Sequence, residues 1–100
     1  MYYIYFLYST NSDIYYVGYT DDYLRRLQEH NSSARDAFSK KHRPWVLKAV
    51  FEAGMDRGQA MKIEKFIKKQ KSRKLIERII AGEKLTGILA QLVRVPHVRD

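Results

Sequence analysis

Two aromatic segments joined by a polar turn decide the fold near the start of the chain. Residues 2–20 read YYIYFLYSTNSDIYYVGYT, and residues 2–8 and 14–19 of this stretch are mostly β-branched or aromatic. Such segments favour β-strands that are buried on both faces. The residues between them, 9–13, are all of types that favour turns. The stretch therefore predicts a β-hairpin.

The register of this hairpin determines which tyrosines meet. A turn centred between residues 11 and 12 would place Tyr5 opposite Gly18. Directly opposed residues share a face of the sheet, and so do residues two apart on one strand. Tyr5 and Tyr16 would then be diagonal neighbours on one face, about 7–8 Å apart at the backbone. Tyrosines also fill the cores of sheets, but two buried phenols on one face need hydrogen-bonding partners.

The rest of the chain extends the hairpin to an α+β fold. Beyond the two hairpin strands, the predicted elements are a helix from residues 20–22 to about residue 30, a strand over 45–52, and helices over 56–71 and 72–82. Residues 31–44 are polar and basic without periodicity, which predicts a long loop. The order β-β-α-β-α-α predicts a three-stranded, mostly antiparallel sheet flanked by three helices. Residues 1–82 would form the domain, and residues 83–100 a tail that is either docked or disordered.

Composition excludes several classes of protein. The chain has 100 residues and no cysteine, which excludes a disulfide framework, a zinc–thiolate site and an iron–sulfur cluster. No apolar run approaches the roughly 18 residues of a membrane span, and the first residues lack the basic start of a signal peptide. We therefore expect a cytoplasmic protein that does not enter a membrane. The net charge of +8 and the pI of about 9.8 are typical of a nucleic-acid binder, although a basic surface that serves only solubility would look the same.

The cations are concentrated in two parts of the chain. Residues 62–78 contain eight lysines and arginines but only two glutamates, and the predicted loop contains four more cations. Contacts with phosphates along these surfaces would make binding depend on salt, whereas the alternative is a solvated helix face. Together with Gly18, where the missing side chain opens the backbone, the residues expected to contact nucleic acid are Arg35, Lys40, Lys41, Arg43, Lys65, Lys68 and Lys69.

Three polar side chains lie at the edges of predicted buried helix faces. Arg26 and His30 are one turn apart and flank an apolar stripe that includes Leu24. Glu64 lies at the rim of the buried arc of the next helix, where a carboxylate is costly unless it is paired or binds a metal. Each has a structural alternative, namely an arginine that extends to solvent, a solvated histidine and an ion-paired glutamate.

This set of residues resembles the GIY-YIG endonucleases. The segments Tyr3-Ile4-Tyr5 and Tyr16-Val17-Gly18 are similar to the paired signature of that family, and Arg26, His30 and Glu64 follow in the family's order. The resemblance covers about residues 2–80 and is greatest for small stand-alone members. Tyr3 stands where the first signature has glycine, and Tyr19 stands where many members have lysine.

The resemblance implies metal-dependent hydrolysis of phosphodiester bonds in DNA. By analogy, Glu64 would hold Mg²⁺ or Mn²⁺, and Arg26 would contact the phosphate. Tyr5 would be the general base and Tyr16 would orient water or phosphate, or the two tyrosines would exchange these roles. His30 would accept the phenolic proton or orient Tyr5.

Two other functions fit the residues alone. One is a nucleic-acid-binding module without efficient catalysis, which metal-dependent nicking of DNA would exclude. The other is a protein-interaction domain that docks through residues 83–100, which predicts DNA affinity that is negligible and insensitive to salt.

Overall fold

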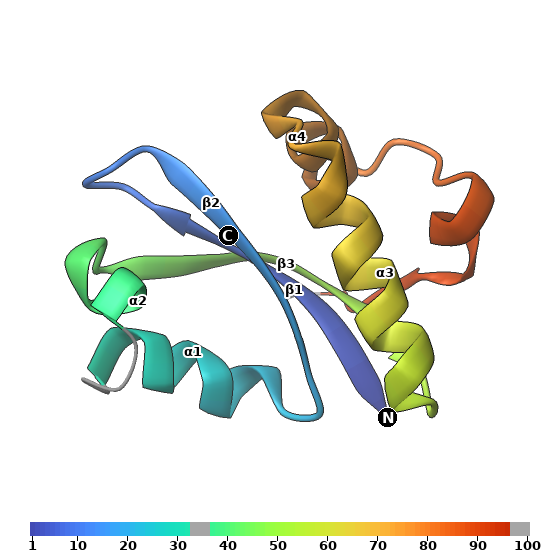
Figure 1. Ribbon diagram of the computed structural model, residues 1–100, viewed down its shortest axis with the longest axis horizontal. Helices are drawn as coiled ribbons and strands as arrows, with labels where there is room; N and C mark the ends of the chain where they lie inside the picture. The colour runs from blue at the N-terminus through green and yellow to red at the C-terminus, as the bar shows by residue number, and fades with distance from the viewer. Residues whose placement is uncertain (33–36, 97–100) are drawn as a thin grey trace.

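The structure, a computed structural model, describes residues 1–32 and 37–96 as a sheet between two groups of helices (Figure 1). The strands are β1 (Tyr2–Ser9), β2 (Ile14–Thr20), β3 (Trp45–Gly54) and β4 (Val93–Arg94). The helices are α1 (Tyr23–Ser32), α2 (Ala37–Lys41), α3 (Arg57–Gln70), α4 (Arg73–Ala81) and the short 3-10 helix η1 (Gly87–Gln91). No helix in this described part of the chain is long and apolar enough to cross a membrane.

The sheet has the strand order β2-β1-β3-β4, and every neighbouring pair is antiparallel. The helices α1 and α2 lie on one side of it and α3 and α4 on the other (Figure 1). The strand β2 forms one edge, so groups from both helical layers can meet around it.

The hairpin has the predicted register. Tyr5 lies opposite Gly18, and Leu7 lies opposite Tyr16. The turn is closed by a 2.8 Å hydrogen bond from the backbone amide of Asp13 to the carbonyl of Ser9. Because side chains alternate between the two faces of a strand, this register places the two tyrosines on the face that α1 covers.

The two faces of the sheet have different cores. The face toward α3 and α4 is aliphatic and aromatic, and its buried residues include Ile4, Phe6, Val17, Ile63, Ile67 and Ile79. The face toward α1 and α2 buries Tyr5, Leu7, Trp45 and Val50, with Tyr23 and Leu27 packed against them. Apolar burial is therefore larger on the α3 side.

The tail adds a fourth strand, so the prediction of a three-stranded sheet was wrong. β4 pairs with β3 through Phe51 opposite Arg94 and Glu52 opposite Val93. Leu89 and Leu92 in the same segment are buried in the core on the α3 side. This burial docks residues 83–96 on the domain, although a two-residue strand has no periodicity that sequence can reveal. The domain boundary at residue 82 stays a prediction.

Two predictions for the region after β2 were also wrong. The predicted loop over 31–44 includes the end of α1 and the five-residue helix α2, so the described residues flank the sheet with four α-helices rather than three. The side chain of Trp45 stabilises α2 by donating a 3.0 Å hydrogen bond to the carbonyl of Ser39. Leu24, predicted to be buried, is 64% exposed because α1 turns Tyr23 and Leu27 toward the sheet instead.

The predicted ends of α3 and α4 are confirmed. Asp56 caps α3 by accepting a hydrogen bond from the amide of Gly58, and Ser72 caps α4 by accepting from Leu75. Gly82 ends α4 with a left-handed backbone at φ 91°, a conformation that favours glycine. The Asp56 cap sets where α3 begins and hence the rotation at which Glu64 meets the sheet.

Candidate active site

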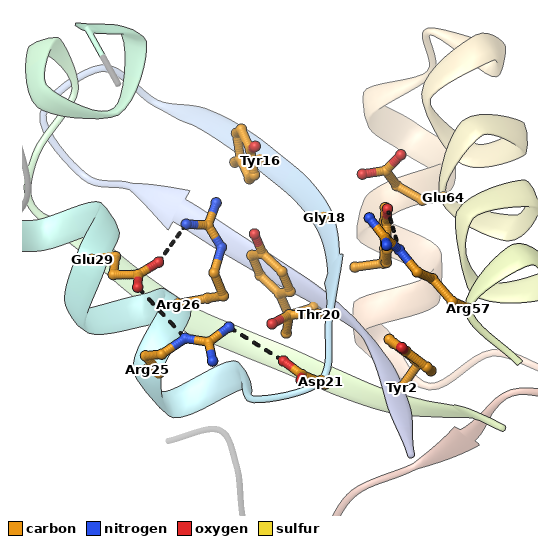
Figure 2. Close-up of a pocket in the computed structure, with 12 residues that line it drawn as sticks. Tyr2, Tyr16, Gly18, Thr20, Asp21, Arg25, Arg26, Glu29, Arg57 and Glu64 are labelled. Carbon is orange, nitrogen blue, oxygen red and sulfur yellow. Dashed lines mark hydrogen bonds and ion pairs between the residues drawn. The ribbon is translucent and has the colours of Figure 1, made fainter. Parts of the chain in front are cut away.

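A pocket of about 580 Å³ lies at the edge of the sheet, around β2 (Figure 2). Four of the five candidate catalytic residues line it: Tyr5, Tyr16, Arg26 and Glu64. Figure 2 shows that α1 contributes Arg25, Arg26 and Glu29 on one side of β2, and that α3 contributes Arg57 and Glu64 on the other. The pocket therefore exists because β2 is an edge strand that both helical layers reach around.

Gly18 opens the path by which Tyr5 reaches this pocket. The ring of Tyr5 lies directly over Gly18, and a Cβ atom at that position would overlap both the ring and its hydroxyl. The glycine thus makes room for a side chain from the opposite strand. The sequence indicated that Gly18 admits an approaching group, and in the structure that group is Tyr5.

The hydroxyl of Tyr5 begins a chain of buried hydrogen bonds. It lies 3.1 Å from Nε2 of His30, and Nδ1 of the same ring lies 2.6 Å from the hydroxyl of Ser39. His30 is only 2% exposed, so its position at the edge of the predicted stripe does not leave it solvated. The chain links β1 to α2 through α1, and it satisfies polar groups that would otherwise be costly to bury.

The two phenols lie close together but differ in environment. Their ring centres are 6.2 Å apart, with an angle of 26° between the planes. Burial raises the pKa of Tyr5 above its ordinary value, the neighbouring Tyr16 and Glu64 raise it further, and Arg26 opposes these effects. Tyr5 is therefore protonated at neutral pH in the isolated chain.

Arg26 is held in place by its own helix. Its guanidinium forms a 2.6 Å ion pair with Glu29 and lies 3.4 Å from Nε2 of His30. Burial disfavours its charge, but the hydrogen bond to Glu29 and the proximity of Tyr5 raise the pKa of Arg26 overall. The pocket thus contains a permanent cation beside the Tyr5 hydroxyl.

Glu64 faces the pocket from the opposite layer. Ile63 and Ile67 of α3 are buried against the sheet, which leaves Glu64 at the rim with its side chain 14% exposed. Its carboxylate lies 3.4 Å from Nζ of Lys68, whose ammonium also lies 5.1 Å from the centre of the Tyr16 ring. The ion pair that residue types alone allowed is present, and it lies within the pocket wall.

The described residues contain no group of three or more His, Cys, Asp or Glu side chains that could hold a metal. A single partly buried carboxylate beside open space suits an ion that keeps much of its water, as Mg²⁺ does. The donor chemistry at Glu64 therefore fits a hydrated divalent cation that also binds substrate oxygen atoms.

The predicted nucleic-acid contacts fall into different places. Lys40 and Lys41 are exposed on α2, and Lys65 and Lys69 are exposed on α3. Arg43 instead donates a 2.8 Å hydrogen bond to the carbonyl of His30, which connects it to the end of α1. Arg35 lies outside the described residues.

The pocket also contains residues that the sequence did not single out. Nε of Arg57 lies 3.4 Å from the phenol oxygen of Tyr19. Arg25 forms ion pairs with Asp21 and Glu29. The spacing of Glu29 three residues after Arg26 was a usable signal for their ion pair. No sequence signal pointed to Arg57, because only the packing of α3 on the sheet brings it to β2.

Comparison with known proteins agrees with this geometry. A model of the GIY-YIG catalytic domain matches residues 1–77. The UPF0213 protein lwe0147 of Listeria welshimeri is 42% identical over 72 residues, which cover 68% of this chain and 79% of that protein. The UPF0213 protein lmo0166 of Listeria monocytogenes is 43% identical over 68 residues, or 64% of this chain and 74% of that protein. Since the match spans every residue of the pocket, the chain belongs to the GIY-YIG family, whose catalytic domains are typically nucleases.

Proposed function

We propose that this protein is a cytoplasmic, metal-dependent endonuclease that hydrolyses phosphodiester bonds in DNA at the pocket beside β2. The observation that carries this proposal is the convergence of Tyr5, Arg26 and Glu64, from three different elements, on one pocket. Such hydrolysis needs a base for water, a cation for the phosphate and a ligand for a metal ion. The net charge of +8 would attract the polyanionic substrate.

Tyr5 is the better candidate for the base. Nε2 of His30 lies 3.1 Å from the Tyr5 hydroxyl and can accept its proton. No described residue places such an acceptor beside the Tyr16 hydroxyl. If His30 carries its proton on Nδ1 and donates to Ser39, Nε2 accepts the phenolic proton. The attacking water would then transfer a proton to the Tyr5 oxygen as the phenolic proton moves to His30, and Tyr16 would orient the water or the phosphate.

Arg26 and Glu64 would act on the phosphate from opposite sides of β2. Arg26 would donate hydrogen bonds to the phosphate oxygens and stabilise the negative charge that develops during attack. Glu64 would hold Mg²⁺ or Mn²⁺, and the bound ion would supply Lewis-acid stabilisation of the phosphate and of the leaving oxygen. Lys68 would release Glu64 for this role and contact phosphate, together with the exposed cations Lys40, Lys41, Lys65 and Lys69.

A second candidate is a nucleic-acid-binding module with little catalysis. The raised pKa of Tyr5 favours it, because a protonated phenol is a poor base. The Lys68–Glu64 ion pair favours it as well, since it neutralises the carboxylate that α3 contributes to the pocket. Catalysis therefore depends on whether substrate and metal displace Lys68.

The decisive experiment is a cleavage assay with a panel of labelled DNA and RNA structures in Mg²⁺ or Mn²⁺. We expect wild-type protein to nick DNA, and Glu64→Gln and Arg26→Ala to lose cleavage by about 10²-fold or more while their thermal unfolding is unchanged. The exposed carboxylate Glu83 provides the control, because Glu83→Gln removes a charge outside the pocket. Cleavage by Glu64→Gln at the wild-type rate would show that the metal role is wrong.

A further inference from the structure

A second pocket of about 470 Å³ adjoins the first and shares Tyr16 with it. Its floor is apolar and comes from β2, α3 and α4, with Val17, Ile67 and Ile76 among its residues. Its volume lies within the roughly 300–1,000 Å³ of pockets that hold small ligands. We call it the Phe38 groove. The catalytic steps above involve this groove only through Tyr16 and Lys68, which also line it.

An aromatic side chain forms part of the wall of this groove. Phe38 of α2 is 46% exposed, and its ring centre lies 6.3 Å from that of Tyr16. The Phe38 ring also lies near the rings of His42 and Trp45, with centres 4.7 Å and 6.2 Å away. Phe38 is thus held within a cluster of rings while part of its surface is exposed, as in a stacking platform for a planar group.

Three cations near the junction of α3 and α4 border the apolar floor. Lys68, Lys71 and Arg73 all line the groove. Lys68 connects it to the first pocket, because its ammonium lies 3.4 Å from Glu64 and 5.1 Å from the Tyr16 ring. An apolar, aromatic surface with a cationic rim complements a planar base attached to a phosphate chain. An uncharged apolar ligand would not need the rim.

We propose that the Phe38 groove binds an unpaired nucleobase of the DNA strand whose phosphate occupies the first pocket. This rests on the proposed function, and it deepens that function by naming the substrate class as DNA with an unpaired nucleotide beside the scissile bond. A base within a duplex is stacked on both faces and cannot enter the groove without unpairing, which costs free energy and is least costly where the base is already unpaired. Tyr16, shared by both pockets, sets the position of that base relative to the phosphate.

The test is a binding measurement with the Glu64→Gln chain, so that the DNA stays intact. Its probes are a short single-stranded DNA and an oligomer of the same length with abasic sugars, which match in phosphates and differ only in bases. We expect the base-containing strand to bind about tenfold more tightly, the range for loss of a base–aromatic stack. Adding Phe38→Ala should remove this preference, whereas Phe38→Trp should keep it.

The matched control is Phe66→Ala, because Phe66 is also an exposed phenylalanine, 38% exposed on α3, and lies outside the groove. It should leave the preference intact, and thermal unfolding verifies that each variant is folded. A preference that survives Phe38→Ala in the folded protein would overturn the inference. So would a change in oligomeric state on Phe38→Ala without a change in DNA binding, which would indicate that a second copy of the chain covers the groove.

The two proposals fail in different ways. A base preference that depends on Phe38, in a wild-type protein that cuts no DNA with Mg²⁺ or Mn²⁺, would support the subsite and reject the endonuclease. Cleavage of fully paired and unpaired DNA at equal rates, unaffected by Phe38→Ala, would support the endonuclease and reject the subsite.

Discussion

The two faces of the sheet differ in what they bury. The face toward α3 and α4 packs Ile4 and Phe6 against Ile63 and Ile67, and its buried residues are apolar. The face toward α1 and α2 buries a hydrogen-bonded chain of Tyr5, His30 and Ser39. The first face supplies most of the apolar burial that stabilises the fold, and the second positions polar groups for chemistry. Because β2 is an edge strand, Glu64 of α3 can face the same pocket as the polar groups on the α1 side of the sheet.

The largest effect should come from the apolar face. Ile63→Ala removes a fully buried side chain from α3, and we expect the free energy of unfolding to fall by about 2–5 kcal/mol. Denaturant unfolding measures this loss. The neighbouring substitution Glu64→Gln should change stability little, because that side chain lies at the pocket wall rather than in the core. Equal losses from both substitutions would contradict the division between the faces.

The next effect should come from Gly18, where the polar face reaches the edge of the sheet. Gly18→Ala places a methyl group where the ring of Tyr5 lies, so either the ring moves or the strands separate. We expect a loss of about 1–3 kcal/mol in stability, together with loss of DNA cleavage. Gly54→Ala gives a comparison, because its Cβ meets no atom but its φ of 92° is strained. If the Gly18→Ala protein cut DNA at the wild-type rate, cleavage would not depend on the observed position of Tyr5.

The smallest effect should appear at high pH and should be specific to the polar face. The pKa of Tyr5 is raised in the folded protein, whereas it is about 10 in the unfolded chain. Its contribution to stability is therefore complete below pH 10 and is lost as the pH rises toward the folded value. We expect stability to decline there by up to about 1.4 kcal/mol per pH unit.

Tyr5→Phe isolates this contribution, because the other tyrosines remain to titrate in both proteins. Unfolding measured across that range should decline less steeply with pH for Tyr5→Phe than for wild type. Parallel curves would show that the Tyr5 phenol is not shielded from ionisation by the fold.

The hairpin and the helix caps were predictable because their causes are local. The turn at 9–13 sets the register that opposes Tyr5 and Gly18, and Asp56 and Ser72 accept amide hydrogen bonds two or three residues away. Helix α2 and strand β4 were missed for the opposite reason. Each is too short to show periodicity, and each is stabilised by contacts outside its own residues, such as the bond from Trp45 to Ser39 and the burial of Leu89.

The candidate site divides in the same way. The sequence by itself determined the hairpin, the cations of α3 and the candidate residues Tyr5, Tyr16, Arg26, His30 and Glu64. Local spacing and family resemblance can both be recognised in short stretches of chain. Only the tertiary structure decided that Ser39 would lie behind His30, that Arg57 would reach β2 and that Phe38 would border a groove beside Tyr16. The physical reason is that each of these neighbours depends on how a helix packs on the sheet, and that packing is set by the whole buried surface rather than by any one segment.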